Sequence, residues 1–313
     1  MARRPIPGIV TAMTRTGAPP ARRRVIDTYQ DGDRFERFCF LLAAALITSG
    51  VVHLGVFVVD GGPWSGPISW RKAVTFGVTF GVVLAVLVAV TRYARVAPGV
   101  RRSLLGGFAA ASVMEVVAIT VQAWRQVRSQ TVGTSGLDVA LGRSGAVFGA
   151  VIIVTVVGLA LATIRPASGT RPSMRLALAT GYLGLLVGLG IGVTMIVRSV
   201  IAADGAAEIQ INAVGVSLVP AHLVSMSGVV LLPAIAWIVS PGPGPERRRV
   251  AIVGLAVVGH LLLAGVVVGE SFAGIDPLIP AEAPVPATLL ATLGIVTLLS
   301  AAGAAALERA ASA

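Results

Sequence analysis

The segment Asp60-Gly-Gly-Pro-Trp-Ser-Gly-Pro-Ile-Ser-Trp-Arg-Lys72 separates two long apolar runs, at residues 37–59 and 72–92. Each run can cross a hydrocarbon core of about 30 Å as an α-helix, which takes about 20 residues at 1.5 Å per residue. The segment between them is short and polar, and it holds two of the four Trp residues and the only Lys. This pattern predicts a tight loop between two antiparallel transmembrane helices.

The same alternation continues along the 313-residue chain, which is 55% hydrophobic and only 12% charged. A soluble domain carries about twice that charged fraction. Unbroken apolar runs favour helices over a membrane β-barrel, whose strands alternate over about 10 residues. We therefore predict an all-α polytopic bundle of about eight transmembrane helices, at residues 37–59, 72–92, 103–123, 144–164, 175–197, 212–239, 249–269 and 285–306.

The basic residues sort by side of the membrane. The chain has 25 basic residues. Nineteen of them lie on the side of the membrane that holds both termini, and six lie on the other side. The positive-inside rule then places both termini in the cytoplasm. The net charge of +11 does not indicate nucleic-acid binding, because the charges sit between apolar runs. All basic residues but one are Arg, which with abundant Ala, Val and Gly indicates a GC-rich bacterial genome and a bacterial plasma membrane.

One membrane domain, residues 36–308, accounts for most of the chain. Residues 1–35 are rich in Arg, Pro and Thr without an apolar period, so we expect a disordered basic cytoplasmic segment that suits anionic lipid headgroups. Residues 309–313 form a short cytoplasmic tail. The single cysteine, Cys39, excludes an internal disulfide and a cysteine-based metal site.

Polar residues inside the apolar runs are the candidates for function. Glu115 lies within the third run, and an ionisable group at the bilayer centre costs about 2.5–3.5 kcal/mol on insertion scales. Gln122 lies seven residues later on the same helix face, and Trp124-Arg125 follows. This stripe indicates either a structural carboxyl or a carboxylate that carries a proton or a cation.

The three histidines also lie in apolar runs. His53 precedes the first loop, and its pairing with Glu115 gives too few ligands for a catalytic zinc, so we predict no metal site. His222 and His260 are expected at similar depth on adjacent antiparallel helices. They are core histidines with hydrogen bonds, proton relays, or the two axial ligands of haem b.

Arg71 and Lys72 open the second helix on the side where basic residues are rare. Two interpretations stay open for this pair. The side chains lock the first three helices together by pairing with Asp60 or Glu115, or they bind an anionic ligand at the outer mouth of the bundle.

Small residues four apart mark close helix contacts, because they let two backbones approach. They occur in the fifth run, and the pattern repeats in the second run and in the seventh. They predict either packing within the chain or, through the fifth run, a homo-oligomer. These residues are Gly184, Gly188 and Gly192, Gly77 and Gly81, and Gly265 and Gly269.

The loop at 60–72, together with Glu115 and the later Gln122-Ala-Trp-Arg125, resembles a family of uncharacterised bacterial multi-pass integral membrane proteins. His53 before the Gly-Gly-x-Trp loop fits the family pattern, and the resemblance covers roughly residues 40–130. The family often has Ser-His-Phe-Asn after the Trp-Arg pair, where this chain has Ser129 followed by Gln130-Thr131-Val132. The resemblance implies a fold and a membrane location but no activity.

We predict transport or small-ligand binding through a polar site in the outer half of the bundle, and nothing in the sequence assigns an enzymatic reaction. The alternatives are a membrane redox protein with haem b on His222 and His260, and a structural or sensory partner of another membrane protein. The predicted partners are the lipid bilayer and a proton or small anionic ligand. The predicted ligand-binding residues are His53, Arg71, Lys72, Glu115, Gln122 and Arg125.

Overall fold

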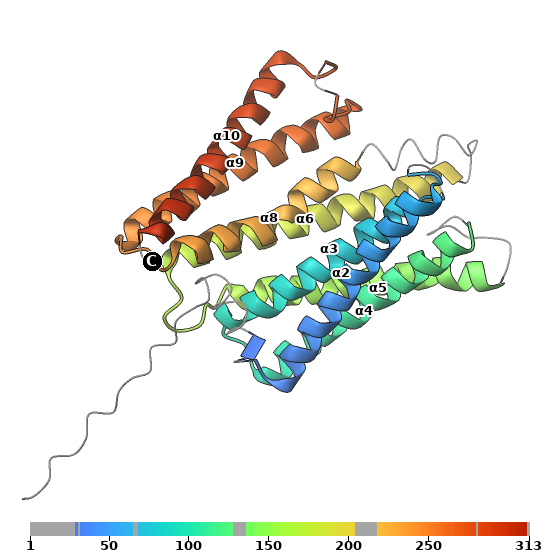
Figure 1. Ribbon diagram of the computed structural model, residues 1–313, viewed down its shortest axis with the longest axis horizontal. Coiled ribbons are helices and arrows are strands. Elements are labelled where there is room, and N and C mark those ends of the chain that lie inside the picture. The colour runs from blue at the N-terminus through green and yellow to red at the C-terminus, as the bar shows by residue number, and fades with distance from the viewer. Residues whose placement is uncertain are drawn as a thin grey trace, which may run out of the picture.

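The computed structural model describes residues 29–30, 32–64, 68–127, 136–203, 218–279 and 281–311. Over these ranges the chain is all-α (Figure 1). All eight α-helices described are long and apolar enough to cross a membrane, which confirms the predicted fold and a multi-pass membrane protein. They are α2 (Arg34–Asp60), α3 (Trp70–Val90), α4 (Pro98–Trp124), α5 (Gly136–Thr163), α6 (Pro172–Ala203), α8 (Val219–Val239), α9 (Glu246–Ala273) and α10 (Val285–Ala310).

Most helices extend beyond the predicted apolar runs, since a helix continues into the interface after its hydrophobic part ends. Asp33 caps α2 by accepting a hydrogen bond from the backbone N–H of Glu36, so this helix begins at Arg34. α5 begins eight residues before the predicted start, at Gly136. The predicted start of the sixth run and most of the basic N-terminal segment lie outside the described residues.

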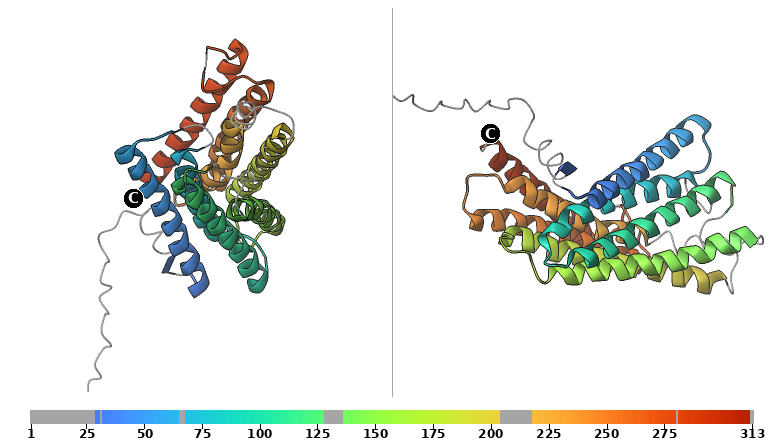
Figure 2. Two further views of the ribbon diagram at one scale, coloured as in Figure 1. Left: turned by 90° about the vertical axis from the view of Figure 1, so that its right-hand side faces the viewer. Right: turned by 90° about the horizontal axis from the view of Figure 1, so that it is seen from below.

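The helix ends fall into two groups, which we call the inner end and the outer end after the predicted orientation. At the inner end, the loops at 91–97, 164–171 and 240–245 meet, together with the start of α2 and the end of α10. There Ala94 pairs with Pro166 in an isolated β-bridge, which follows the short 3-10 helix η1 (Thr91–Tyr93). Residues 61–64 and 68–69 and the end of α4 lie at the outer end (Figure 2).

Two sets of four helices follow one another along the chain, and we call them the first half (α2–α5) and the second half (α6–α10). Consecutive helices pack against each other within each half (Figures 1 and 2). α10 stands away from α6 towards the outer end (Figure 1), whereas α9 stays in contact with α6 there, since the guanidinium of Arg198 lies 5.3 Å from the ring centre of Phe272. Contact between the halves runs mainly through α5 with α6 and α3 with α8.

Glycines bring helix backbones together within each half. In α3, a Cβ atom added to Gly77 would lie 2.8 Å from the backbone nitrogen of Gly50 in α2. In α6, the three glycines face the backbone of Ser225, the side chain of Met226 and the ring of His222, all on α8. These contacts are the packing within the chain that the spacing predicted as one of two interpretations, and the homo-oligomer through Gly184, Gly188 and Gly192 stays a prediction.

The seventh run does not follow the glycine pattern. Gly265 and Gly269 of α9 have open space where a Cβ atom would lie. The close helix contact of α9 instead involves Gly259, where an added Cβ would lie 2.7 Å from the carbonyl oxygen of Gly294 in α10.

Ion pairs neutralise part of the basic inner end. The buried carboxylate of Glu36 pairs with Arg92 at 2.6 Å and also with Arg101, which joins the starts of α2 and α4 to the end of α3. Asp33 accepts a hydrogen bond from the backbone N–H of Glu36 and pairs with Arg102 at 2.8 Å. Both contacts hold the pKa of Asp33 below its usual value.

A Gly77→Ala substitution tests the close contact of α2 and α3. We expect a loss of about 1–3 kcal/mol in unfolding free energy, because the added methyl group meets backbone atoms that cannot move aside. The measurement is unfolding by SDS in mixed micelles, followed by circular dichroism.

The matched control is Gly265→Ala, where the methyl group meets open space. This variant is expected to be as stable as the parent or more stable by up to about 1 kcal/mol, because Ala favours a helix over Gly. Equal effects of the two substitutions would contradict the packing described for α2 and α3.

Candidate functional site

Aromatic side chains gather at the outer end of the first half. The rings of Trp70 and Trp124 meet edge to face, with centroids 5.2 Å apart, and His53 lies 6.0 Å from the first and 6.2 Å from the second. Trp64 packs on Phe57 with centroids 4.8 Å apart. These contacts join α2, the loop at 61–69, α3 and α4, at the level where Trp side chains favour the membrane boundary.

His53 has a hydrogen-bond partner on each ring nitrogen. Nδ1 donates to the carbonyl oxygen of Ser49 at 2.6 Å, and Nε2 accepts from the indole N–H of Trp124 at 3.1 Å. This arrangement requires a neutral imidazole with its proton on Nδ1. His53 is also buried, so its geometry is that of a structural histidine that fixes α2 against α4.

Arg125 lies at the end of α4 and bonds two side-chain oxygens, one in α4 and one in α5. Its Nη1 donates to Oδ1 of Asp138 at 2.6 Å and to Oε1 of Gln122 at 3.0 Å. Asp138 comes from the first turn of α5 and is buried. The Nε2 atom of Gln122 is buried too, and it has no hydrogen-bond partner among the described residues.

Glu115 lies nine residues before the end of α4, about 13 Å along the helix axis from Trp124. It is 5% exposed, and within the described ranges its carboxyl group makes no hydrogen bond and no ion pair. Its carboxyl oxygen lies 3.6 Å from the position of a Cβ atom on Gly145 of α5. Glu115 therefore faces α5 at a point where the opposing helix carries no side chain.

These residues form one feature, the α4–α5 polar seam, which comprises Glu115, Gln122, Arg125 and Asp138. Hydrogen bonds bring together two of the six predicted ligand-binding residues, Gln122 and Arg125, and Glu115 lies two helical turns from Gln122 on the same helix. Sequence reasoning missed Asp138, because it was assigned to a loop rather than to the first turn of α5. The signal that could have found it was the position of Arg125, a cation at the edge of the membrane that needs an anionic partner.

Arg71 and Lys72 lie in the first turn of α3 at the outer end, and both are half-buried. The predicted lock required an ion pair with Asp60 or Glu115. Neither carboxylate has an ion-pair partner in the part of the chain that the structure describes. The anion-binding interpretation of Arg71 and Lys72 is not tested by these contacts and stays a prediction.

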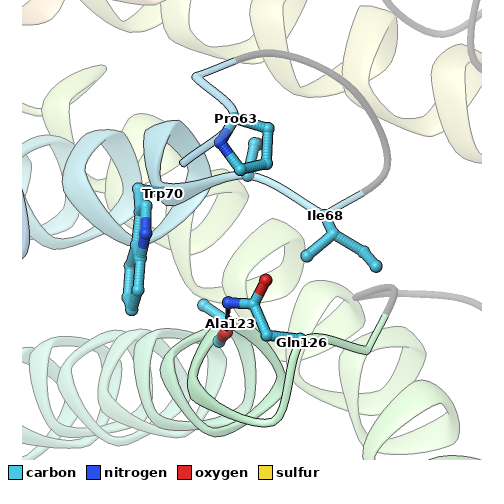
Figure 3. Close-up of a pocket in the computed structure, with 6 residues that line it drawn as sticks. Pro63, Ile68, Trp70, Ala123 and Gln126 are labelled. Atoms are coloured by element: carbon cyan, nitrogen blue, oxygen red, sulfur yellow. Dashed lines mark hydrogen bonds between the residues drawn. The ribbon is translucent and has the colours of Figure 1, made fainter. Parts of the chain in front are cut away.

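A narrow pocket lies between the loop and the last turn of α4. Figure 3 shows Pro63 and Ile68 above Ala123 and Gln126, with Trp70 at one side. The space between them is too tight for a water molecule. The remaining wall is Ser69, a buried residue whose hydroxyl oxygen has no partner among the described residues.

His222 and His260 lie at different levels in the second half. His222 is in the first turn of α8, where Nδ1 donates to the carbonyl oxygen of Gly188 at 2.6 Å. His260 lies midway along α9, with Nε2 2.6 Å from the position of a Cβ on Gly228. Gly228 is six residues beyond His222, or about 9 Å deeper along α8.

The expectation that the two imidazoles share one depth is therefore wrong. It assumed that the sixth helix began near residue 212, whereas α8 begins at Val219 with Pro220 in its first turn. Haem ligation by this pair stays a prediction, and it requires movement of the two rings to one level. Metal binding was not predicted, and the described residues contain no group of three or more His, Cys, Asp or Glu side chains placed to hold an ion.

Comparison of the chain with protein families, with curated proteins and with solved structures gave no match. The resemblance found in the sequence therefore stays a prediction, and the proposals below depend on the geometry alone.

A Trp124→Phe substitution tests the structural role of His53. It removes the indole donor but keeps an aromatic ring, so we expect a loss of about 1 kcal/mol in unfolding free energy. Nitrogen-15 NMR of labelled histidine should show the Nδ1-protonated form in the parent and a shifted Nε2 resonance in the variant.

Trp64→Phe is the control, because Trp64 contacts Phe57 by ring packing and not His53. Its histidine resonances should match those of the parent. An imidazolium signal for His53 at neutral pH would contradict the assigned tautomer.

Proposed function

We propose that the protein moves protons across the membrane, alone or together with a small anionic substrate, and that Glu115 is the group that takes up the proton. The observation that carries this proposal is the burial of Glu115 without a partner among the described residues. A buried carboxylate without a countercharge is costly, so the group is held neutral by a proton or paired with a bound cation.

The ligand set favours a proton over a metal cation. Hard cations such as Mg²⁺ and Ca²⁺ take six or more oxygen ligands. Glu115 supplies one carboxyl group, and it faces Gly145 of α5, which has no side chain. A proton needs only one carboxylate oxygen, and a single carboxyl group is sufficient for it.

The α4–α5 polar seam supplies a route between Glu115 and the outer surface. Arg125 and Asp138 lie at its outer end, and Gln122 lies between them and Glu115. Gln122 is two helical turns from Glu115, about 10 Å, so proton transfer along the seam requires water between the two side chains. The described charged groups of these helix segments, besides Glu115, are Arg125, Asp138 and the exposed Arg143 of α5.

The basic residues at the outer end fit an anionic co-substrate. Arg71 and Lys72 lie beside Trp70, where basic charge runs against the inside preference of membrane proteins. They would raise the local concentration of an anion at the outer mouth by long-range attraction. Neutralisation of both residues would therefore weaken anion uptake more than proton uptake.

Glu115→Gln tests the proposal in proteoliposomes that enclose a pH-sensitive dye. After the external pH is lowered, the parent should acidify the interior faster than empty vesicles. The variant should acidify the interior at least about tenfold more slowly than the parent, because an amide does not take up and release a proton at the pH of the assay.

Glu270→Gln is the matched control, since Glu270 is another buried glutamate in α9 at the outer end. It should keep the parent rate. The proposal is overturned if Glu115→Gln acidifies the vesicles as fast as the parent does.

A further inference from the structure

Two arginines lie opposite each other at the inner end, where the segment after η1 pairs with the segment after α5. Ala94 and Pro166 form the antiparallel bridge, and the backbone N–H of Arg95 donates to the carbonyl oxygen of Arg165 at 2.7 Å. Residues opposite each other in such a pair have Cβ atoms roughly 4.5–5.5 Å apart on one face. Ala94 is buried and both arginines are exposed, so the face that carries the arginines points away from the protein.

The two guanidinium groups are suited to bind one anion. Like charges directly opposite each other destabilise a pair of strands, and an anion between them removes this cost. Nη2 of Arg95 donates to Oγ of Ser168 at 3.0 Å, which orients the guanidinium and leaves its other N–H groups available. The planar fork of arginine matches two oxygens of a phosphate group better than an ammonium does.

The carboxylates at the inner end are engaged by other arginines. Each carboxylate that the structure describes there has its own ion pair: Asp33 with Arg102, Glu36 with Arg92 and Arg101, Glu246 with Arg249, and Glu308 with Arg248. The anion that would neutralise Arg95 and Arg165 is therefore not one of these groups.

An apolar stripe on α5 leads directly to the arginine pair. Val154, Val157, Leu161 and Ile164 follow one another at helical spacing, and all four side chains are exposed. Ile164 is 72% exposed and immediately precedes Arg165. In a helix that crosses the membrane, such a stripe contacts acyl chains, whereas the end of the helix lies at the level of the lipid headgroups. The combination fits a molecule with an anionic head and an apolar tail.

We propose that Arg95 and Arg165 bind the phosphate group of an anionic phospholipid, whose acyl chain lies along the exposed stripe of α5. Basic groups between transmembrane helices at the membrane surface are known to hold such headgroups. The bound phosphate reduces the repulsion between the two guanidinium groups and so stabilises the pairing of the loops at 91–97 and 164–171. The inference goes beyond the proposed proton transport and does not depend on Glu115.

The test measures binding of phosphatidylglycerol to the purified full-length protein in detergent micelles by native mass spectrometry. Phosphatidylcholine is the comparison, because its headgroup has no net charge, and the parent should bind it more weakly. Arg165→Gln should weaken phosphatidylglycerol binding about fivefold, the effect of one arginine near a membrane surface. Arg95→Gln combined with Arg165→Gln should weaken it at least about tenfold.

Loss of folding is separated from loss of binding by thermal unfolding in phosphatidylcholine alone. The side chain of Arg165 has no ion pair within the described ranges, so Arg165→Gln should melt at the parent temperature there. Added phosphatidylglycerol should raise the melting temperature of the parent more than that of the variant, because a ligand of the native state stabilises it.

Arg247→Gln is the matched control. Arg247 is an exposed arginine in the first turn of α9, at the same end of the bundle, and its replacement removes the same charge. This variant should bind phosphatidylglycerol with the parent affinity.

Parent affinity in Arg165→Gln would overturn the inference. Equal weakening by Arg165→Gln and Arg247→Gln would overturn it too, because the effect would then come from the total charge of the inner end. Glycerol 3-phosphate, which has the anionic group without acyl chains, should not displace the lipid at equal concentration. Displacement at that concentration would indicate a site for a free anion and would contradict the role of the α5 stripe.

Discussion

The lipid interior offers no hydrogen-bond partners, and this constraint explains most of the structure. Backbone groups must bond within each helix, so the chain crosses the membrane only as helices. Side chains obey the same constraint: His53 bonds Ser49 and Trp124, and Arg125 bonds Gln122 and Asp138. Glu115 departs from this constraint at a high cost, because it is a buried carboxyl group without a hydrogen-bond or ion-pair partner among the described residues, and that cost makes it the candidate for function.

Helix association in lipid depends on close packing rather than on the hydrophobic effect, because lipid tails are as apolar as the side chains they replace. The glycine contacts of α2 with α3 and of α6 with α8 supply that packing inside each half. Between the halves, the shared core and the Tyr93–Trp237 bond supply the contact.

Hydropathy predicted the eight helices, because the length of an apolar run acts locally along the chain. It could not predict partners that only the fold brings together, such as Trp124 for His53 and Gly145 for Glu115. Asp138 was missed and His222 was placed too deep for one reason. Hydropathy does not locate a helix end where the flanking sequence is weakly polar, and both residues lie in the first turn of a helix.

The small-residue pattern shows the same limit. Four-residue spacing identified the contact surface of α6 but also marked Gly265 and Gly269, which have open space around them. The spacing of glycines shows where another helix can approach closely. Which helix does so depends on the arrangement of the helices in the bundle. A glycine is informative only when the facing helix is known.

The four indoles are divided unequally between the two ends of the molecule. Trp64, Trp70 and Trp124 lie at the outer end, and Trp237 lies at the inner end beside Tyr93. Intrinsic fluorescence is therefore dominated by one membrane boundary, and a water-soluble quencher added to sealed vesicles would dim the emission strongly from one side and weakly from the other. Quenching of the tryptophan fluorescence therefore reports the direction in which the protein is inserted into the vesicle.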